Sequence, residues 1–172
     1  LNKIDSFFEI GGSFGANIHL LLNNFKNVRK VLYLDVAPNL FIATEYLRNY
    51  FGDSVKDYLE LKNKKIIFSN NENLEIYCIS PWQLPNVNSQ IDHFHNSCSF
   101  AEMTFEIVEN YSKYIKKIIK KNGSLSLMFD KLDTSRYVSN EDILNMFNLP
   151  FEHEEYKDLY LEKLHDLYCL KN

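Results

Sequence analysis

The feature of this sequence that most constrains its fold is a cluster of glycines between an apolar run and an amphipathic segment. The apolar run covers residues 6–10, and Gly11, Gly12 and Gly15 follow it. From residue 16 to residue 25, apolar side chains then recur at helical spacing. This order predicts a strand, a tight loop and a helix. Because glycine allows a tight turn and a close approach to the backbone, the loop is a candidate ligand site.

Apolar runs and helical patterns alternate along the rest of the chain. Further strands are predicted at residues 30–35, 65–69, 74–79, 91–96 and 124–129, and an antiparallel pair at 151–157 and 165–170. Helices are predicted from Pro38 to Tyr50 and from about Phe100 to Lys121. The apolar stripe predicted for the second helix consists of Met103, Ile107, Tyr111, Ile115 and Ile118. This alternation predicts an α/β fold, with a doubly wound, mainly parallel sheet in three layers, α/β/α.

The composition limits the class of protein. The 172 residues are 45% hydrophobic, which is enough for the core of a single domain over residues 1–172. A net charge of -4 argues against a nucleic-acid partner, whose binding surface would be basic. No apolar run approaches the roughly 20 residues that span a bilayer. Scattered cysteines and the lack of a signal-peptide pattern favour a cytoplasmic location. The oligomeric state is not predicted.

Two acidic residues beside the glycine loop indicate the charge of the ligand. A dinucleotide-binding loop reads G-x-G-x-x-G/A, but Ser13 stands here in place of the central glycine. A carboxylate at Glu9, just before the loop, repels a pyrophosphate and attracts a cation such as the sulfonium or ammonium of S-adenosylmethionine. Asp35 ends the second predicted strand, where a carboxylate can accept hydrogen bonds from both ribose hydroxyls. The pair therefore favours an uncharged ribose on a cofactor with a positive end.

The loop resembles the first motif of the class I, Rossmann-like methyltransferases, which reads acid-x-Gly-x-Gly-x-Gly. Residues 9–15 match this motif except at Ser13. More narrowly, the chain is similar to a family of bacterial sugar O-methyltransferases. The matching segments are Tyr33-Leu34-Asp35, Glu45-Tyr46-Leu47, Ser80-Pro81-Trp82-Gln83-Leu84 and residues 91–103, with Tyr111 downstream. The segment Asn-Ser-x-Ser-Phe-x-Glu-Met, residues 96–103, is the most specific part of the resemblance.

The resemblance implies S-adenosylmethionine as cofactor and a sugar hydroxyl as acceptor, within a surface glycan or a nucleotide-linked precursor. The residues expected to bind the cofactor around the loop are Glu9, Gly11, Gly12, Ser13, Gly15 and Asp35. Members of the family carry an additional N-terminal region, and this sequence opens at Leu1 without an initiator methionine. We therefore expect it to be part of a longer protein.

The segment at 91–96 supplies candidates for the chemistry. A sugar hydroxyl is a poor nucleophile, so methyl transfer benefits from a base at hydrogen-bond distance. His95 is the preferred base because its ordinary pKa lies near working pH, and Glu102 is the second candidate. Asn96 is expected to bind the cofactor or the acceptor. The alternatives are a core position for His95, a turn-forming role for Asn96 and stabilisation of a helix N-terminus by Glu102.

The remaining polar clusters give less specific indications. Ser80 and Trp82 follow the strand that flanks the adenine in this class, so Trp82 is expected to stack on that ring or to lie in the core. The sequence around His153 shows no spacing of metal ligands, and no metal is predicted. A run of lysines at 116–121 is expected to be a solvated helix face.

Two other function classes fit the same pattern. A nicotinamide-dependent oxidoreductase shares the strand, loop and helix, although Ser13 and Glu9 argue against it. A further alternative is a non-catalytic relative that keeps the fold as a binding or assembly module, because a fold does not determine a function.

Overall fold

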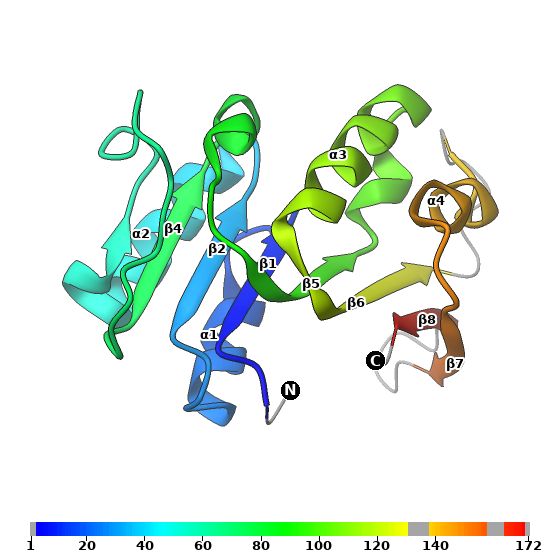
Figure 1. Cartoon of the computed structure of the whole chain (residues 1–172), viewed down its shortest axis with the longest axis horizontal. Helices are drawn as coiled ribbons and strands as arrows, with labels where there is room; N and C mark the ends of the chain where they lie inside the picture. Colours follow the sequence, from blue (N-terminus) through cyan, green and yellow to red (C-terminus); the bar gives the residue numbers. More distant parts are fainter. Residues whose placement is uncertain (1–2, 131–137, 158–163, 171–172) are drawn as a thin grey trace.

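The structure is a computed structural model, which describes residues 3–130, 138–157 and 164–170. The strands are β1 (Ser6–Ile10), β2 (Lys30–Leu34), β3 (Val55–Lys56), β4 (Glu75–Ile79), β5 (Ile91–Ser97), β6 (Ile119–Asp130), β7 (Glu152–Lys157) and β8 (Leu164–Leu170). They form one sheet in the order β3-β4-β2-β1-β5-β6-β8-β7 (Figure 1). The pairs from β3 to β6 are parallel, whereas β8 is antiparallel to both β6 and β7.

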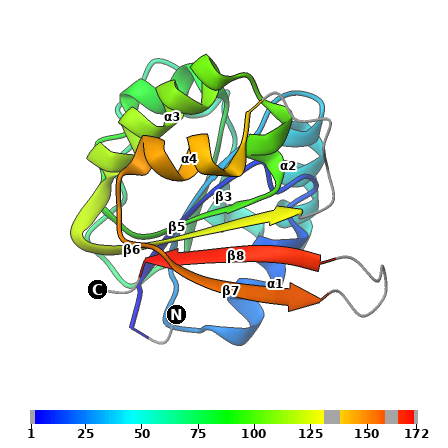
Figure 2. The ribbon, with the colours of Figure 1, turned by 90° about the vertical axis from the view of Figure 1, so that its right-hand side faces the viewer.

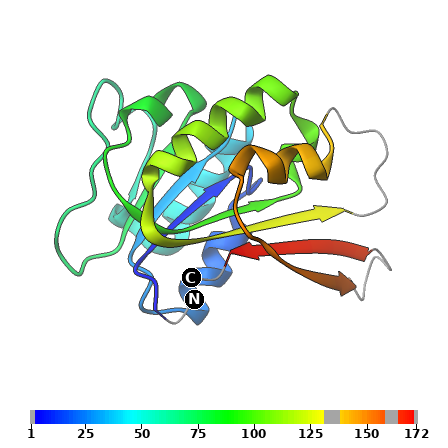
Figure 3. The same ribbon diagram turned by 45° about the vertical axis from the view of Figure 1, so that its right-hand side comes forward.

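Helices connect the parallel strands and cover the sheet on both faces. The helices are α1 (Ala16–Asn24), α2 (Asn39–Phe51), α3 (Phe105–Ile118) and α4 (Asn140–Phe147), and the short 3-10 turns are η1 (Gly52–Ser54), η2 (Pro81–Asn86) and η3 (Ser99–Glu102). Figures 2 and 3 show α3 and α4 on one side of the sheet and α1 on the other. In the described part of the chain, no helix combines the length and the apolar character needed to cross a membrane.

The three layers follow from the alternation of side chains along each strand. Phe8 and Ile10 of β1 pack with Val108 and Ile115 in the core between the sheet and α3. Phe7, from the same strand, joins a second core with residues of α1 and α2. Both faces of the strands are therefore apolar, which is characteristic of a parallel sheet. The predicted three-layer α/β fold is confirmed.

Three local predictions were wrong. The long helix predicted from about Phe100 begins only at Phe105, because η3 precedes it, and it ends at Ile118 before β6. Its buried stripe includes Val108, and Ile107 is 45% exposed. The strand predicted at 65–69 is reduced to a single bridge between Ile66 and Val87.

Some elements fall on weak sequence signals. The short strand β3 and helix α4 were not predicted from the sequence. The antiparallel pair predicted near the C-terminus is confirmed as β7 and β8. Because β8 lies between β6 and β7, this pair extends the parallel sheet with one antiparallel strand.

Candidate functional site

A cavity of about 540 Å³ lies at the carboxyl ends of β1, β2 and β5. The residues that line it are Ile10, Gly11, Ser13, Leu34, Asp35, Val36, Asn39, Ser97, Cys98, Ser99, Glu102, Met103, Ile107 and Tyr111. Ligands of parallel α/β sheets bind at this edge, and the volume suits a ligand the size of a nucleoside derivative. The cavity therefore joins the glycine loop, which follows β1, to the segment that leads from β5 into α3.

The first two glycines of the loop make room for protein side chains. Gly11 has a φ of 73°, and a Cβ atom there would collide with the side chain of Ser99. A Cβ atom on Gly12 would lie 2.6 Å from Oε2 of Glu9 and 2.8 Å from the ring of Tyr33. The sequence suggested that these glycines let a ligand approach. The structure shows that side chains of β1, β2 and η3 also occupy this space. Gly15 directly precedes α1.

Asp35 joins the end of β2 to the glycine loop. Its Oδ2 atom accepts a hydrogen bond from the backbone N–H of Ser13 at 3.1 Å and one from the hydroxyl of Tyr33 at 2.9 Å. Its Oδ1 atom accepts from the N–H of Val36 at 2.7 Å. A carboxylate offers about four acceptor positions, so one position remains on Oδ1. In this arrangement Asp35 can accept from one ribose hydroxyl, not from both as the sequence analysis expected.

Glu9 lies beneath the loop, on the sheet face that α1 and α2 cover. Only 1% of its surface is exposed. Oε1 accepts a hydrogen bond from the Asn17 side chain at 2.7 Å, whereas Oε2 has no hydrogen-bond partner among the described residues. Burial raises the pKa of Glu9 to about 7, with a smaller contribution from the charge of Asp35. Glu9 is therefore close to the loop but does not line the cavity, and only part of its population is charged at neutral pH.

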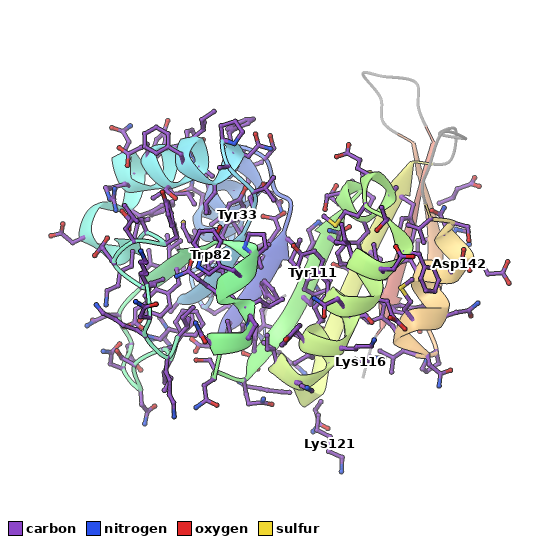
Figure 4. All side chains as sticks on the ribbon, turned by 90° about the horizontal axis from the view of Figure 1, so that it is seen from above. Tyr33, Trp82, Tyr111, Lys116, Lys121 and Asp142 are labelled. Carbon is purple, nitrogen blue, oxygen red and sulfur yellow. The ribbon has the colours of Figure 1, made fainter. Side chains whose placement is uncertain are left out.

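The opposite wall of the cavity comes from η3 and α3. Glu102 places a carboxylate there, beside the apolar side chains of Met103 and Ile107. Tyr111 also lines this wall, and burial followed by the negative charge of Asp35 raises its pKa. Figure 4 labels Tyr111 on α3 and Tyr33 on the other side of the molecule's centre. The wall formed by the glycine loop and Asp35 is therefore polar. The opposite wall is apolar and carries one carboxylate, that of Glu102.

His95, the preferred candidate base, lies away from the cavity. Its ring lies on the opposite face of the sheet from the cavity, tilted against Phe7, and its Nδ1 atom is hydrogen-bonded to the Ser126 hydroxyl at 2.7 Å. The same hydroxyl contacts Nε2 of His93 at 2.9 Å. Burial lowers the pKa of His95 to about 4. His95 does not line the cavity and is a weak base, so its placement does not support the predicted contact with an acceptor.

Asn96 does not line the cavity, and its side chain is hydrogen-bonded within the protein. It is fully buried. Its side-chain N–H₂ group donates to the carbonyl oxygen of Ile10 at 2.9 Å and to the hydroxyl of Ser99 at 2.6 Å. Its Oδ1 atom accepts from the N–H of Phe100 at 3.2 Å. These bonds fix the ends of β1 and β5 behind the cavity.

Ser80 and Trp82 lie outside the residues that line the cavity. Ser80 is buried at the start of η2, where it forms a reciprocal capping box with Gln83. Trp82 is 60% exposed and meets the Tyr58 ring edge to face at 6.0 Å. Its predicted position in the core is therefore wrong, and its predicted contact with an adenine remains a prediction. Across the described residues, no group of three or more His, Cys, Asp or Glu side chains is placed to hold a metal ion.

Of the residues that line the cavity, Gly11, Ser13, Asp35 and Glu102 were predicted as site residues, and the others were not. Two hydroxyl groups with no predicted role also hold the loop. Tyr33 is a fully buried strand residue whose hydroxyl contacts both the loop and Asp35. Ser99 packs against Gly11, and its hydroxyl donates to the carbonyl oxygen of Ile10 at 3.1 Å. Tyr33 resembles any apolar strand residue in the sequence, and no local pattern indicates that its hydroxyl reaches a loop.

No family model and no curated protein matches this sequence. Solved structures match it at low identity. The mitomycin 7-O-methyltransferase MmcR has a TM-score of 0.64 and 12% identity, over 99% of this chain and 50% of MmcR. The N-methyltransferase NodS from Bradyrhizobium japonicum WM9, in complex with S-adenosyl-L-homocysteine, has a TM-score of 0.68 and 12% identity, over 98% of this chain and 78% of NodS.

A third match is an S-adenosylmethionine-dependent methyltransferase from Clostridium acetobutylicum ATCC 824. It has a TM-score of 0.62 and 11% identity, over 98% of this chain and 85% of that protein. The chain spans about half the length of MmcR. At these identities the likeness shows the fold, and that fold is the Rossmann-like fold of class I methyltransferases.

Proposed function

We propose that this protein is an S-adenosylmethionine-dependent O-methyltransferase that transfers the methyl group to a sugar hydroxyl. The observation that carries the proposal is the hydrogen bond between Asp35 and the Ser13 N–H, at the edge of a cavity that both residues line. It brings the acid at the end of β2 and the loop after β1 to one nucleoside-sized site. The match to NodS, which was solved with S-adenosyl-L-homocysteine, supports this choice of cofactor.

The described residues fit the proposed cofactor in shape and charge. Asp35 holds a ribose hydroxyl through the acceptor position left on Oδ1. The loop backbone from Gly11 to Ser13 forms the adjacent wall. Glu9, with its unpartnered Oε2 atom, adds partial negative charge beneath this loop. When bound, S-adenosylmethionine supplies a methyl group activated on a sulfonium centre.

Glu102 is our candidate for the base that accepts the proton from the acceptor hydroxyl. It is the carboxylate on the wall formed by η3 and α3, and it lines the same cavity as Asp35. Its side chain is exposed, so an acceptor entering from solvent can reach it. Met103 and Ile107 beside it offer an apolar surface to the nonpolar face of a sugar ring. The sugar acceptor itself is proposed from the sequence resemblance of residues 91–103.

The sheet order argues against a nicotinamide-dependent enzyme. The typical dinucleotide-binding sheet is mostly parallel and is built from two similar halves, with strand order 3-2-1-4-5-6. Here β8 is antiparallel and is inserted between β6 and β7. Together with Ser13 in the loop, this difference favours a methyl donor over a dinucleotide. A binding module without catalysis is distinguished from an enzyme only by assay.

Isothermal titration calorimetry with S-adenosylhomocysteine tests the cofactor. We expect the wild-type protein to bind and Asp35→Ala to weaken the affinity at least about tenfold, because a charged hydrogen-bond acceptor is lost. Asp53→Ala, a change to an exposed acid in η1, is the matched control and should alter the affinity less than about twofold. No detectable binding by the folded wild-type protein would refute the proposal.

A further inference from the structure

Ser13 adopts a backbone conformation that favours glycine. Its φ is 57°, in the left-handed region. It stands where the first motif of the class I methyltransferases, which this loop resembles, has its middle glycine. A side chain at such a φ costs conformational free energy that other contacts must offset. The loop can keep this shape only if its neighbours hold it.

Both backbone polar groups of Ser13 are held by side chains at the end of β2. The N–H donates to Oδ2 of Asp35 at 3.1 Å, and the carbonyl oxygen accepts from the hydroxyl of Tyr33. The same hydroxyl lies 2.9 Å from Oδ2 of Asp35. The three residues therefore close a ring of contacts that includes the acid proposed to receive the ribose.

Tyr33 can act only as a donor in this ring. Its side chain is fully buried, and burial together with the charge of Asp35 raises its pKa, so the hydroxyl keeps its hydrogen. That one hydrogen lies between two acceptors and is shared by them. Removing the hydroxyl would leave the loop carbonyl without this donor and the carboxylate with one donor fewer.

We propose that Tyr33 is a positioning residue, which holds the Ser13 loop and the Asp35 carboxylate in the arrangement that receives the nucleoside end of the cofactor. The inference rests on the proposed function, because it assigns a role at the same site. Tyr33 does not line the cavity, so it acts through Ser13 and Asp35. In this view the tyrosine compensates for the serine that replaces a motif glycine.

Calorimetry with S-adenosylhomocysteine tests this role in Tyr33→Phe, which keeps the ring and removes the hydroxyl. We expect the dissociation constant to rise about tenfold, because a smaller fraction of the free protein then holds the arrangement that receives the nucleoside. Tyr77→Phe is the matched control, since Tyr77 is also a buried strand tyrosine, but its hydroxyl contacts the carbonyl oxygen of Ile67 at 3.4 Å. The control should bind as wild type does.

A second background separates positioning from general stability. Glycine adopts a positive φ without strain, so the loop needs the tyrosine less when residue 13 is glycine. In the Ser13→Gly background, adding Tyr33→Phe should change the affinity less than about threefold, well below the tenfold change expected with Ser13, because the glycine loop keeps its shape without the hydroxyl. If Tyr33→Phe alone does not fold, the Ser13→Gly background should restore its folding. Equal loss of affinity, or equal failure to fold, in both backgrounds would overturn the inference.

The outcome for the wild-type protein keeps the two proposals apart. Wild-type protein that fails to bind S-adenosylhomocysteine contradicts the proposed function. Wild-type protein that binds, together with Tyr33→Phe that binds equally well, contradicts the role of Tyr33 alone.

Discussion

Glu9, a buried carboxyl group beneath the glycine loop, is only partly charged at neutral pH. Glu9 is almost completely buried, its Oε2 atom lacks a partner among the described residues, and burial raises its pKa to about 7. The predicted attraction of a cationic ligand is strongest when Glu9 carries a full negative charge. The structure supports that argument in part, because the protonated form of Glu9 is also populated at neutral pH.

Glu9→Gln should change how stability depends on pH. The folded-state pKa of Glu9 lies near 7 and its ordinary value is 4.5, so wild-type protein loses stability as pH rises between these values. The glutamine variant has no proton to lose there. Urea unfolding at pH 5, 6, 7 and 8 should therefore show the variant gaining in free energy of unfolding relative to wild type.

The difference between the two proteins isolates Glu9 from other titrating groups. His93 and His95 have pKa values lowered to about 3 and about 4, so they reduce stability on acidification in both proteins equally. Glu141→Gln, at an exposed position of α4, serves as control and should run parallel to wild type. A Glu9→Gln curve that also runs parallel to wild type would contradict the buried, protonated Glu9.

At the scale of elements, the site depends on how three segments are joined at the end of the sheet. Asn96 links the last residue of β1 to the turn η3 through its bonds to Ile10, Ser99 and Phe100. The position of Glu102, at the end of η3, follows from this connection. These hydrogen bonds hold the end of β1 next to η3, and both contribute residues to the cavity.

Asn96→Ala should destabilise the fold and loosen the site together. Removing a fully buried amide leaves the Ile10 carbonyl with one donor fewer and the Phe100 N–H without this acceptor. The expected loss is about 1–3 kcal/mol in the free energy of unfolding, measured with urea. Asn110→Ala, at an exposed position of α3, should change it by less than about 0.5 kcal/mol. Equal effects of the two changes would mean that the Asn96 network contributes nothing.

For the whole molecule, the proposed function depends on the cavity at the carboxyl ends of the sheet strands. Six strands run parallel from β3 to β6, and the β7–β8 pair adds an antiparallel edge. The carboxyl ends of β1, β2 and β5 meet around the cavity. A ligand bound there contacts loops from both halves of the sheet, so its binding should stabilise the whole domain.

Thermal unfolding should distinguish the proposed cofactor from a dinucleotide. A ligand at about 100 times its dissociation constant stabilises a protein by about 2.7 kcal/mol. For a chain of this size, that corresponds to a rise in Tm of about 5–10 °C. We expect this rise with S-adenosylhomocysteine and a change below about 1 °C with NAD. The Asp35→Ala variant, with an affinity about tenfold lower, should show about half of this rise with S-adenosylhomocysteine and no rise with NAD. A comparable rise with NAD would favour the oxidoreductase alternative.

Sequence patterns predicted the elements whose signals are local. Strand β1, the glycine loop and α1 follow from an apolar run, three glycines and a helical period, and the structure has them at those places. The interruption at Met103, between η3 and α3, was not predicted, because the apolar residues Phe100 and Ala101 fit the pattern of the same helix as the residues that follow. In the structure they are buried in η3. The bridge at Ile66 depends on Val87, a partner that no local pattern indicates.

The sequence by itself determined the alternation of the main strands and helices, the glycine loop and the presence of acids at positions 9 and 35. Only the tertiary structure decided which of the candidate residues share a cavity. Asp35 and Glu102 line the same cavity. The side chain of His95 lies on the other face of the sheet, and that of Asn96 is hydrogen-bonded in the interior. The reason is that periodicity reports how a side chain alternates along its own strand. Which face meets a cavity, and which polar atoms are already satisfied, depends on strands and helices distant in the chain.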